Sequence, residues 1–124
     1  MNTLILLASM ALACPPDISL KQEVKPEPGW ATHDPEVPHK YYFAQFSDGP
    51  PERHVILMHD KASRQGKDKV LHYQFLPSQE PWLICSYTGT SAALTRKLPK
   101  AIRSCQLILD HAHNDEIVSE IRCE

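Results

Sequence analysis

Eleven prolines divide this chain of 124 residues into stretches that are too short for long helices. A proline inside a helix removes a backbone hydrogen bond and clashes with the preceding turn. The densest run lies between Lys25 and Lys40, where Pro26, Pro28, Pro35 and Pro38 exclude any regular element. The chain is therefore expected to consist of short elements joined by turns.

The apolar residues between these breaks recur at every second position, which is the period of a half-buried strand. In Val70–Leu76, for example, Leu71, Tyr73 and Phe75 share one face. The same reasoning predicts strands at 17–24, 41–46, 54–59, 70–76, 82–87, 92–98 and 104–109. We expect a mainly β fold, as an antiparallel meander sheet or a partly open barrel stapled by disulfides.

The remaining segments are expected to be irregular, with one exception. The stretch 47–52 reads as a turn, because Asp-Gly supplies positive φ and Pro-Pro stops pairing. Asp60–Lys69 is expected to be an exposed, mobile loop, and Trp30 to fold back over the edge of the core. The exception is Asn114–Cys123, which alternates as a strand, with a helix beginning at Asn114 as the alternative.

The composition is that of a globular protein without an affinity for polyanions. Hydrophobic residues make up 42% and charged residues 23% of the chain, and its net charge is −2. Nucleic-acid binding needs a dense basic patch, and the sequence has none of that density. Nucleic acid is therefore excluded as a partner.

The first thirteen residues, Met1–Ala13, have the features of a secretory signal peptide. They contain no charged side chain, and the apolar run from Leu4 to Ala13 is shorter than the roughly 20 residues that span a bilayer. Ala11-Leu12-Ala13 is a small-x-small cleavage site. We expect a signal peptide at 1–13 and a single domain at 14–124, periplasmic or secreted, with a buried N-terminal element as the alternative.

The residue after this site, Cys14, allows a second cellular location. Ala11-Leu12-Ala13-Cys14 resembles a bacterial lipobox, in which the cysteine is diacylated. In that alternative the protein is a lipid-anchored envelope protein, and only then does it contact a membrane.

Four cysteines in an exported chain indicate two disulfides: Cys14, Cys85, Cys105 and Cys123. Cys85 shares a strand face with Leu83 and Tyr87, and Cys105 shares one with Leu107 and Leu109. Both therefore point with the larger apolar set, which favours Cys85–Cys105 under the core and Cys14–Cys123 near the two ends. The cysteines lack C-x-x-C spacing, which disfavours a zinc site or a thioredoxin-like centre.

Four motifs, in order and spacing, resemble a family of small exported proteobacterial proteins of uncharacterised function. They are Cys14-Pro15, Phe46-Ser47-Asp48-Gly49-Pro50 followed by Glu52, Trp82-Leu83-Ile84-Cys85-Ser86-Tyr87 running into Thr88-Gly89-Thr90, and Leu98-Pro99 leading to Cys105. Members of this family are sometimes encoded near type VI secretion clusters. The resemblance implies an envelope role such as protection against a delivered toxin, and it assigns no catalytic residue.

The histidines are the candidates for a chemical site. On a strand, His111 and His113 would share a face near Asp110 or Asp115, as a metal site requires. We favour the alternative of a polar turn, because Asn114-Asp115 follows at once. The sequence also lacks the G-x-S-x-G motif of serine hydrolases and a glycine-rich phosphate loop, so we expect no catalytic residue, cofactor or metal.

These observations predict a non-catalytic, periplasmic protein-binding domain. Its expected role is that of an inhibitor or immunity-type protein that neutralises an envelope-active enzyme or toxin. Two exposed features could meet this partner, namely the segment Pro26–Pro38 and the basic residues Arg64, Lys67 and Lys69, which otherwise read as a solvated loop. The alternatives are a structural lipoprotein anchored at Cys14, and a small hydrolase or metal-binding enzyme.

Overall fold

The computed structural model describes residues 10–124; most of the expected signal peptide, residues 1–9, lies outside the described residues. Within the described part the chain forms nine strands, and every pairing is antiparallel. They are β1 (Met10–Leu12), β2 (Asp17–Ile18), β3 (His39–Asp48), β4 (Lys61–Gln65), β5 (Asp68–Gln74), β6 (Pro81–Tyr87), β7 (Ala93–Lys97), β8 (Ser104–Leu109) and β9 (Val118–Cys123).

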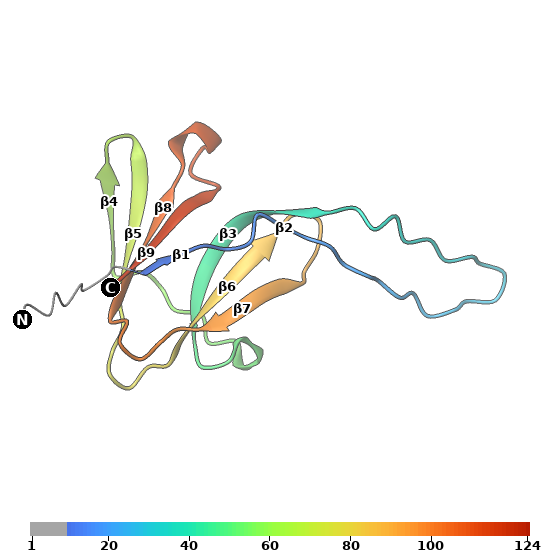
Figure 1. Cartoon of the computed structure of the whole chain (residues 1–124), viewed down its shortest axis with the longest axis horizontal. Coiled ribbons are helices and arrows are strands. Elements are labelled where there is room, and N and C mark those ends of the chain that lie inside the picture. Colours follow the sequence, from blue (N-terminus) through green and yellow to red (C-terminus); the bar gives the residue numbers. More distant parts are fainter. Residues whose placement is uncertain (1–9) are drawn as a thin grey trace, which may run out of the picture.

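The strands form two sheets that do not close into a barrel (Figure 1). One sheet has the order β1-β9-β8-β5-β4, and the other has the order β2-β3-β6-β7. The connections β1–β2, β3–β4, β5–β6 and β7–β8 cross from one sheet to the other. The predicted mainly β, antiparallel fold with two disulfides is confirmed. A helix long and apolar enough to cross a membrane is absent from residues 10–124.

The core lies between the sheets and is built from the alternating apolar faces of their strands. Phe46 of β3 is fully buried, and its ring packs edge-on against Tyr73 of β5 and against Phe75, which directly follows β5, with centroids 4.9 and 5.4 Å apart. The predicted inward faces of β5, β6 and β8 all belong to this core. The period-two pattern therefore identified the buried faces of these three strands correctly.

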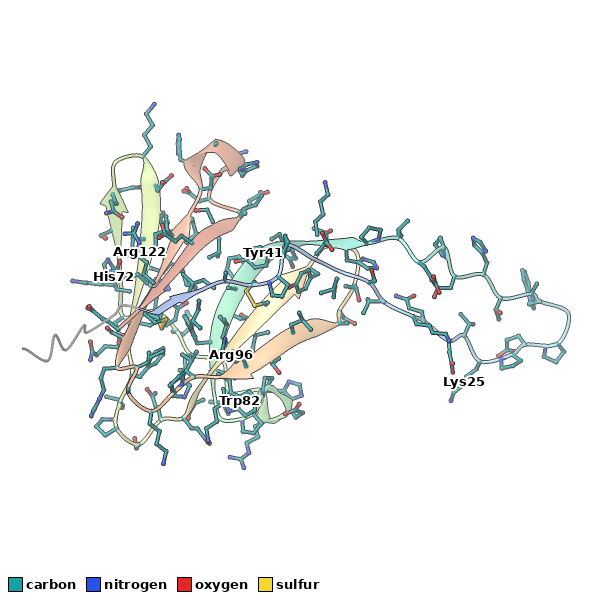
Figure 2. All side chains as sticks on the ribbon, viewed as in Figure 1. Lys25, Tyr41, His72, Trp82, Arg96 and Arg122 are labelled. Carbon is teal, nitrogen blue, oxygen red and sulfur yellow. A yellow bond between two sulfur atoms is a disulfide. The ribbon has the colours of Figure 1, made fainter. Side chains whose placement is uncertain are left out.

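The four cysteines form two disulfides, as expected, but the favoured pairing, Cys85–Cys105 with Cys14–Cys123, is wrong. The structure pairs Cys14 with Cys85 and Cys105 with Cys123, at Cα–Cα distances of 5.8 and 4.0 Å (yellow in Figure 2). Cys85 and Cys105 do point into the core, but they come from different sheets. Cys123 lies directly opposite Cys105 on the neighbouring strand β9, so it is the nearer partner.

The Cys14–Cys85 bond bears on the alternative of a lipid anchor at Cys14. A diacylated cysteine carries its lipid as a thioether on the same sulfur that forms this bond. The disulfide and the lipid anchor at Cys14 therefore exclude each other, and the sulfur of Cys14 is used by the disulfide here.

Two neighbouring segments differ from expectation. The stretch His54–His59 is not a strand, because its pairing is limited to one bridge between Ile56 and Ser47. Conversely, Asp60–Lys69 is not a mobile loop, since β4 and β5 form a hairpin there with Gly66 at φ +63° in the turn. Every residue of β4 is exposed, so this edge strand has no alternation that the sequence could reveal.

The segment before β3 also departs from prediction. The strand expected over Asp17–Val24 ends at Ile18, and an irregular excursion follows, reaching far from the sheets before it returns to His39 (Figure 1). The ambiguous end of the chain, in contrast, forms β9, in agreement with the strand prediction.

Candidate functional site

The basic residues expected to bind a partner lie together at the end of the β4–β5 hairpin. We call Lys61–Lys69 the basic hairpin. Arg64 faces Lys69 across the two strands, and Lys67 lies in the turn between them. The Arg64 guanidinium donates to the carbonyl of Lys67 at 3.1 Å and lies 3.5 Å from the Asp115 carboxylate. The cations therefore belong to an ordered, exposed surface.

The His111–His113 segment is a single 3₁₀ turn, as favoured from the sequence. The Asp110 carboxylate accepts from the backbone N–H of Ala112 at 2.9 Å and lies 2.8 Å from Nδ1 of His113. These contacts, the His113 side chain first, hold the pKa of Asp110 below its usual range. In residues 10–124, no group of three or more His, Cys, Asp or Glu side chains is placed to hold a metal ion.

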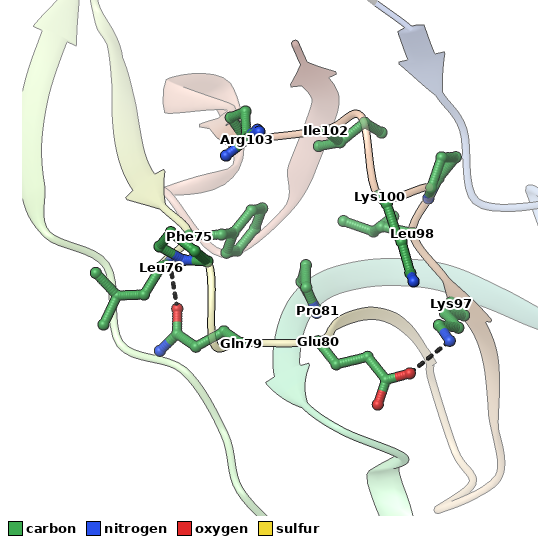
Figure 3. Close-up of a pocket in the computed structure, with 12 residues that line it drawn as sticks. Phe75, Leu76, Gln79, Glu80, Pro81, Lys97, Leu98, Lys100, Ile102 and Arg103 are labelled. Atoms are coloured by element: carbon green, nitrogen blue, oxygen red, sulfur yellow. Dashed lines mark hydrogen bonds and ion pairs between the residues drawn. The ribbon is translucent and has the colours of Figure 1, made fainter.

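A pocket of about 450 Å³ opens where the β5–β6 and β7–β8 connections pass each other (Figure 3). Phe75, Leu98 and Ile102 are buried side chains that line it. Its shape is fixed by backbone hydrogen bonds, from the N–H of Phe75 to the carbonyl of Arg103 at 2.9 Å and from that of Leu98 to the carbonyl of Pro81 at 3.0 Å.

The rim of this pocket is basic. It has three cations, Lys97, Lys100 and Arg103, and one carboxylate, Glu80, which is paired with Lys97. The Lys97 ammonium holds the pKa of the Glu80 carboxyl below its usual range. The arrangement can receive an apolar side chain next to an anionic group.

Sequence reasoning missed this pocket, although a signal was present. The stretch between Glu80 and Asp110 contains basic residues and not one acidic residue. Apolar residues and a proline separate Lys97, Lys100 and Arg103, so the sequence shows no continuous basic segment there.

The excursion before β3, residues 19–38, is the most exposed part of the described structure, and we call it the arm (Figure 1). Trp30 lies in its turn with 81% of its surface exposed, so the expectation that it folds over the core is wrong. Val24 and Val37 are also exposed. Figure 2 shows Lys25 on the arm, well away from the sheets.

The base of the arm is fixed to the four-stranded sheet. Asp17 and Ile18 pair with Lys40 and His39, and Nδ1 of His39 lies 2.7 Å from the carbonyl of Thr88. The hydroxyl of Tyr87 donates to the carbonyl of Pro15 at 2.8 Å. Together with the Cys14–Cys85 disulfide, these contacts hold both ends of the arm.

The two sides of the arm are joined by one carboxylate. Asp34 accepts from the backbone N–H of Gln22 at 2.9 Å and from that of Glu36 at 3.0 Å. These two donors, Gln22 first, hold the pKa of the Asp34 carboxyl below its usual range. At the tip, the N–H of Trp30 donates to the carbonyl of Glu27 at 3.1 Å, and Gly29 adopts φ +85°.

Comparison with known proteins identifies one family. The model of the Type VI secretion system Tli immunity protein family matches residues 34–124. An uncharacterised 16.3 kDa protein in the trpG 5′ region of Azospirillum brasilense is 26% identical over 126 residues, which cover 86% of this chain and 84% of that protein. No solved structure matches.

Proposed function

This chain belongs to the family of Type VI secretion system Tli immunity proteins and is an immunity-type protein that neutralises a toxin, and we propose that it acts by binding the toxin in the periplasm, without turnover. The family match, which spans residues 34–124, is the observation that carries the proposal. In this mechanism one molecule of the protein inactivates one molecule of toxin.

Two features support the periplasm as the place of action. All four cysteines are paired in disulfides, which persist in oxidising compartments. Residues 1–13 have the pattern of a signal peptide, and cleavage after Ala13 would leave Cys14 as the first residue of a domain at 14–124. Such cleavage would also remove β1 and free the edge of β9 from Ile121 to Cys123.

The basic hairpin is proposed to guide the encounter with the toxin. Arg64, Lys67 and Lys69 are exposed or half-buried cations on an ordered edge of the sheet. Charges in such a position increase the association rate with an acidic partner surface, and the effect decays over a Debye length of about 8 Å at physiological salt. The partner is thus a protein toxin with an acidic region near its binding surface.

The experiment begins with a toxin of a type VI secretion system that kills a bacterial host when directed to the periplasm. The toxin used as the probe is one whose killing the wild-type chain suppresses. Purified toxin is then titrated with wild type, and residual toxicity or activity should reach zero at a molar ratio near one. Complete inactivation at a small fraction of that ratio would show turnover and overturn the non-catalytic mechanism.

The association rate tests the basic hairpin separately. Replacing Arg64, Lys67 and Lys69 with alanine should slow association by about tenfold at low salt, with little change in the melting temperature. The matched control replaces Lys40, Arg53 and Arg96, three exposed cations outside the basic hairpin and the pocket. Equal slowing by both triple variants would attribute the effect to net charge and remove the basic hairpin from the mechanism.

Fractionation tests the compartment. The mature protein should be released with the periplasmic fraction, and its intact mass should correspond to a chain that begins at Cys14 with two disulfides. Retention of residues 1–13, or a mass gain of a diacylglyceryl group, would contradict this part of the proposal.

A further inference from the structure

The tip of the arm exposes an apolar surface that has no role in the fold. Trp30 is 81% exposed, and the turn that presents it is ordered by the hydrogen bond between Trp30 and Glu27. Large aromatic side chains dominate the binding energy of protein interfaces when they are buried in a pocket of the partner. A tryptophan held out into solvent on an ordered turn is therefore suited to bind another molecule.

The arm is also prepared for binding before it meets a partner. Pro26, Pro28, Pro35 and Pro38 fix φ at four positions, which reduces the conformational entropy that the segment loses on docking. The Asp34 carboxylate joins its two sides, and its base is tied to β6 by the Cys14–Cys85 disulfide. These constraints keep Trp30 at a defined distance from the sheets.

The shape and charge of the arm specify the partner site. About ten residues on each side of the tip allow a reach of about 30 Å, so the arm can enter a concave site that the sheets cannot. Residues 19–38 carry four carboxylates and two lysines, a net charge of −2 that equals the net charge of the whole protein. An acidic arm with an apolar tip fits an apolar cleft with a basic rim and is repelled by an anionic membrane surface.

We propose that the arm enters an apolar, basic-rimmed cleft of the toxin and that Trp30 is the side chain buried there. The inference rests on the proposed function, and it names the part of the chain that contacts the toxin. The family match begins at Asp34, so the outgoing side of the arm and its tip lie outside the matched segment.

The test compares two equally exposed side chains in the complex with the toxin that wild type neutralises. Trp30→Ala should raise the dissociation constant of the complex by about 30-fold or more, which is the range of an interface hot spot. Met58, which is 79% exposed and lies in the segment between β3 and β4, is the matched control. Met58→Ala should leave binding unchanged.

Hydroxyl-radical footprinting of the wild-type complex supplies a second readout that needs no variant. Trp30 and Met58 are both accessible to oxidation in the free protein. Binding of the toxin should protect Trp30 and leave Met58 as reactive as before. A wild-type chain that binds the toxin with Trp30 still oxidised, or a Trp30→Ala variant that binds as tightly as wild type, overturns the inference and leaves the proposed function intact.

Two further measurements exclude other occupants of the tip. Sedimentation of the free protein should give a monomer, and the protein should not bind phosphatidylglycerol vesicles. A dimer that Trp30→Ala dissociates would assign the tip to a second copy of this chain, and vesicle binding lost in the same variant would assign it to the membrane; either result overturns the inference. Failure of wild type to bind any toxin that it suppresses would instead contradict the proposed function.

Discussion

In the strands β3, β5, β6 and β8, apolar side chains recur at every second position and meet a second apolar face, whereas in the arm Val24, Trp30 and Val37 are exposed to solvent. The sheets are stabilised by the burial of apolar side chains, such as Phe46, Tyr73 and Phe75, whose rings pack against one another between the two layers. The arm is ordered by prolines and a few hydrogen bonds of its own. Order and burial are thus separable in this molecule, and the arm can be ordered and still offer its apolar residues to a partner.

The largest effect is expected from a buried aromatic residue of the sheets. Phe46→Ala should lower the free energy of unfolding by about 3–5 kcal/mol, because it removes a fully buried ring and leaves a cavity between the sheets. Trp30→Ala is the matched change in the arm and should cost less than about 0.5 kcal/mol. Urea unfolding of the three proteins measures both values. A loss for Trp30→Ala close to that for Phe46→Ala would mean that the arm packs on the sheets after all.

Removing the disulfides one at a time should lower the free energy of unfolding by an amount at or below that for Phe46→Ala, and should separate the two regions. In the chain-entropy account, Cys14–Cys85, with a sequence separation of 71, contributes about 4 kcal/mol, and Cys105–Cys123, with a separation of 18, about 3 kcal/mol. Each pair is replaced by two serines, and unfolding is followed as above. The first variant should also lose ordering at the base of the arm, visible as faster amide exchange at Tyr41, whose N–H bonds to the carbonyl of Pro16. Unchanged exchange there would show that the disulfide is not needed to hold the arm.

The smallest effect on stability, and the most local, is expected at Asp34. In Asp34→Asn one of the two acceptor oxygens becomes an amide NH₂ group, so Gln22 or Glu36 loses its bond and its amide exchanges faster. The pKa of Asp34 lies below the ordinary 3.8, so its ordering effect is complete above that value and is lost as the pH falls through the lowered pKa. The protection of the arm amides in wild type, measured relative to the intrinsic exchange rate at each pH, should therefore fall under acidic conditions. Protection of the arm that is equally pH-dependent in Asp34→Asn would place the titrating group elsewhere.

How well each feature could be predicted depends on how far apart in the sequence the residues that determine it lie. The buried faces of β5, β6 and β8 depend on alternation within a few residues, which is visible locally. The strand β4 shows no such pattern because none of its residues is buried. The segment His54–His59 has the apolar pattern of a strand, but a strand also needs a neighbouring strand to pair with. Here the pairing is limited to one bridge, between Ile56 and Ser47, and the local pattern cannot reveal this.

The candidate surfaces were predicted less completely, for the same reason. Strand phase placed Cys85 and Cys105 on inward faces, but only the pairing of β8 with β9 sets Cys105 opposite Cys123. Apolar residues are usually buried, which is why the sequence predicts Trp30 on the core. The residues around Trp30 give no local signal that the proline-rich segment extends away from the sheets and leaves this side chain exposed. The cations around the pocket come together only through the crossing of two connections.

The pairing of the cysteines has a consequence for how the protein is made. A chain that is translocated from its N-terminus presents Cys14, Cys85, Cys105 and Cys123 in that order, and the structure pairs the first with the second and the third with the fourth. Each bond can therefore be closed by an oxidase as soon as its second cysteine emerges, without a non-native intermediate. Disulfide reshuffling takes seconds to hours and needs an isomerase to be fast. In the proposed export, the native bonds would therefore form by oxidation without reshuffling, and the base of the arm would be secured before the last third of the chain has been delivered.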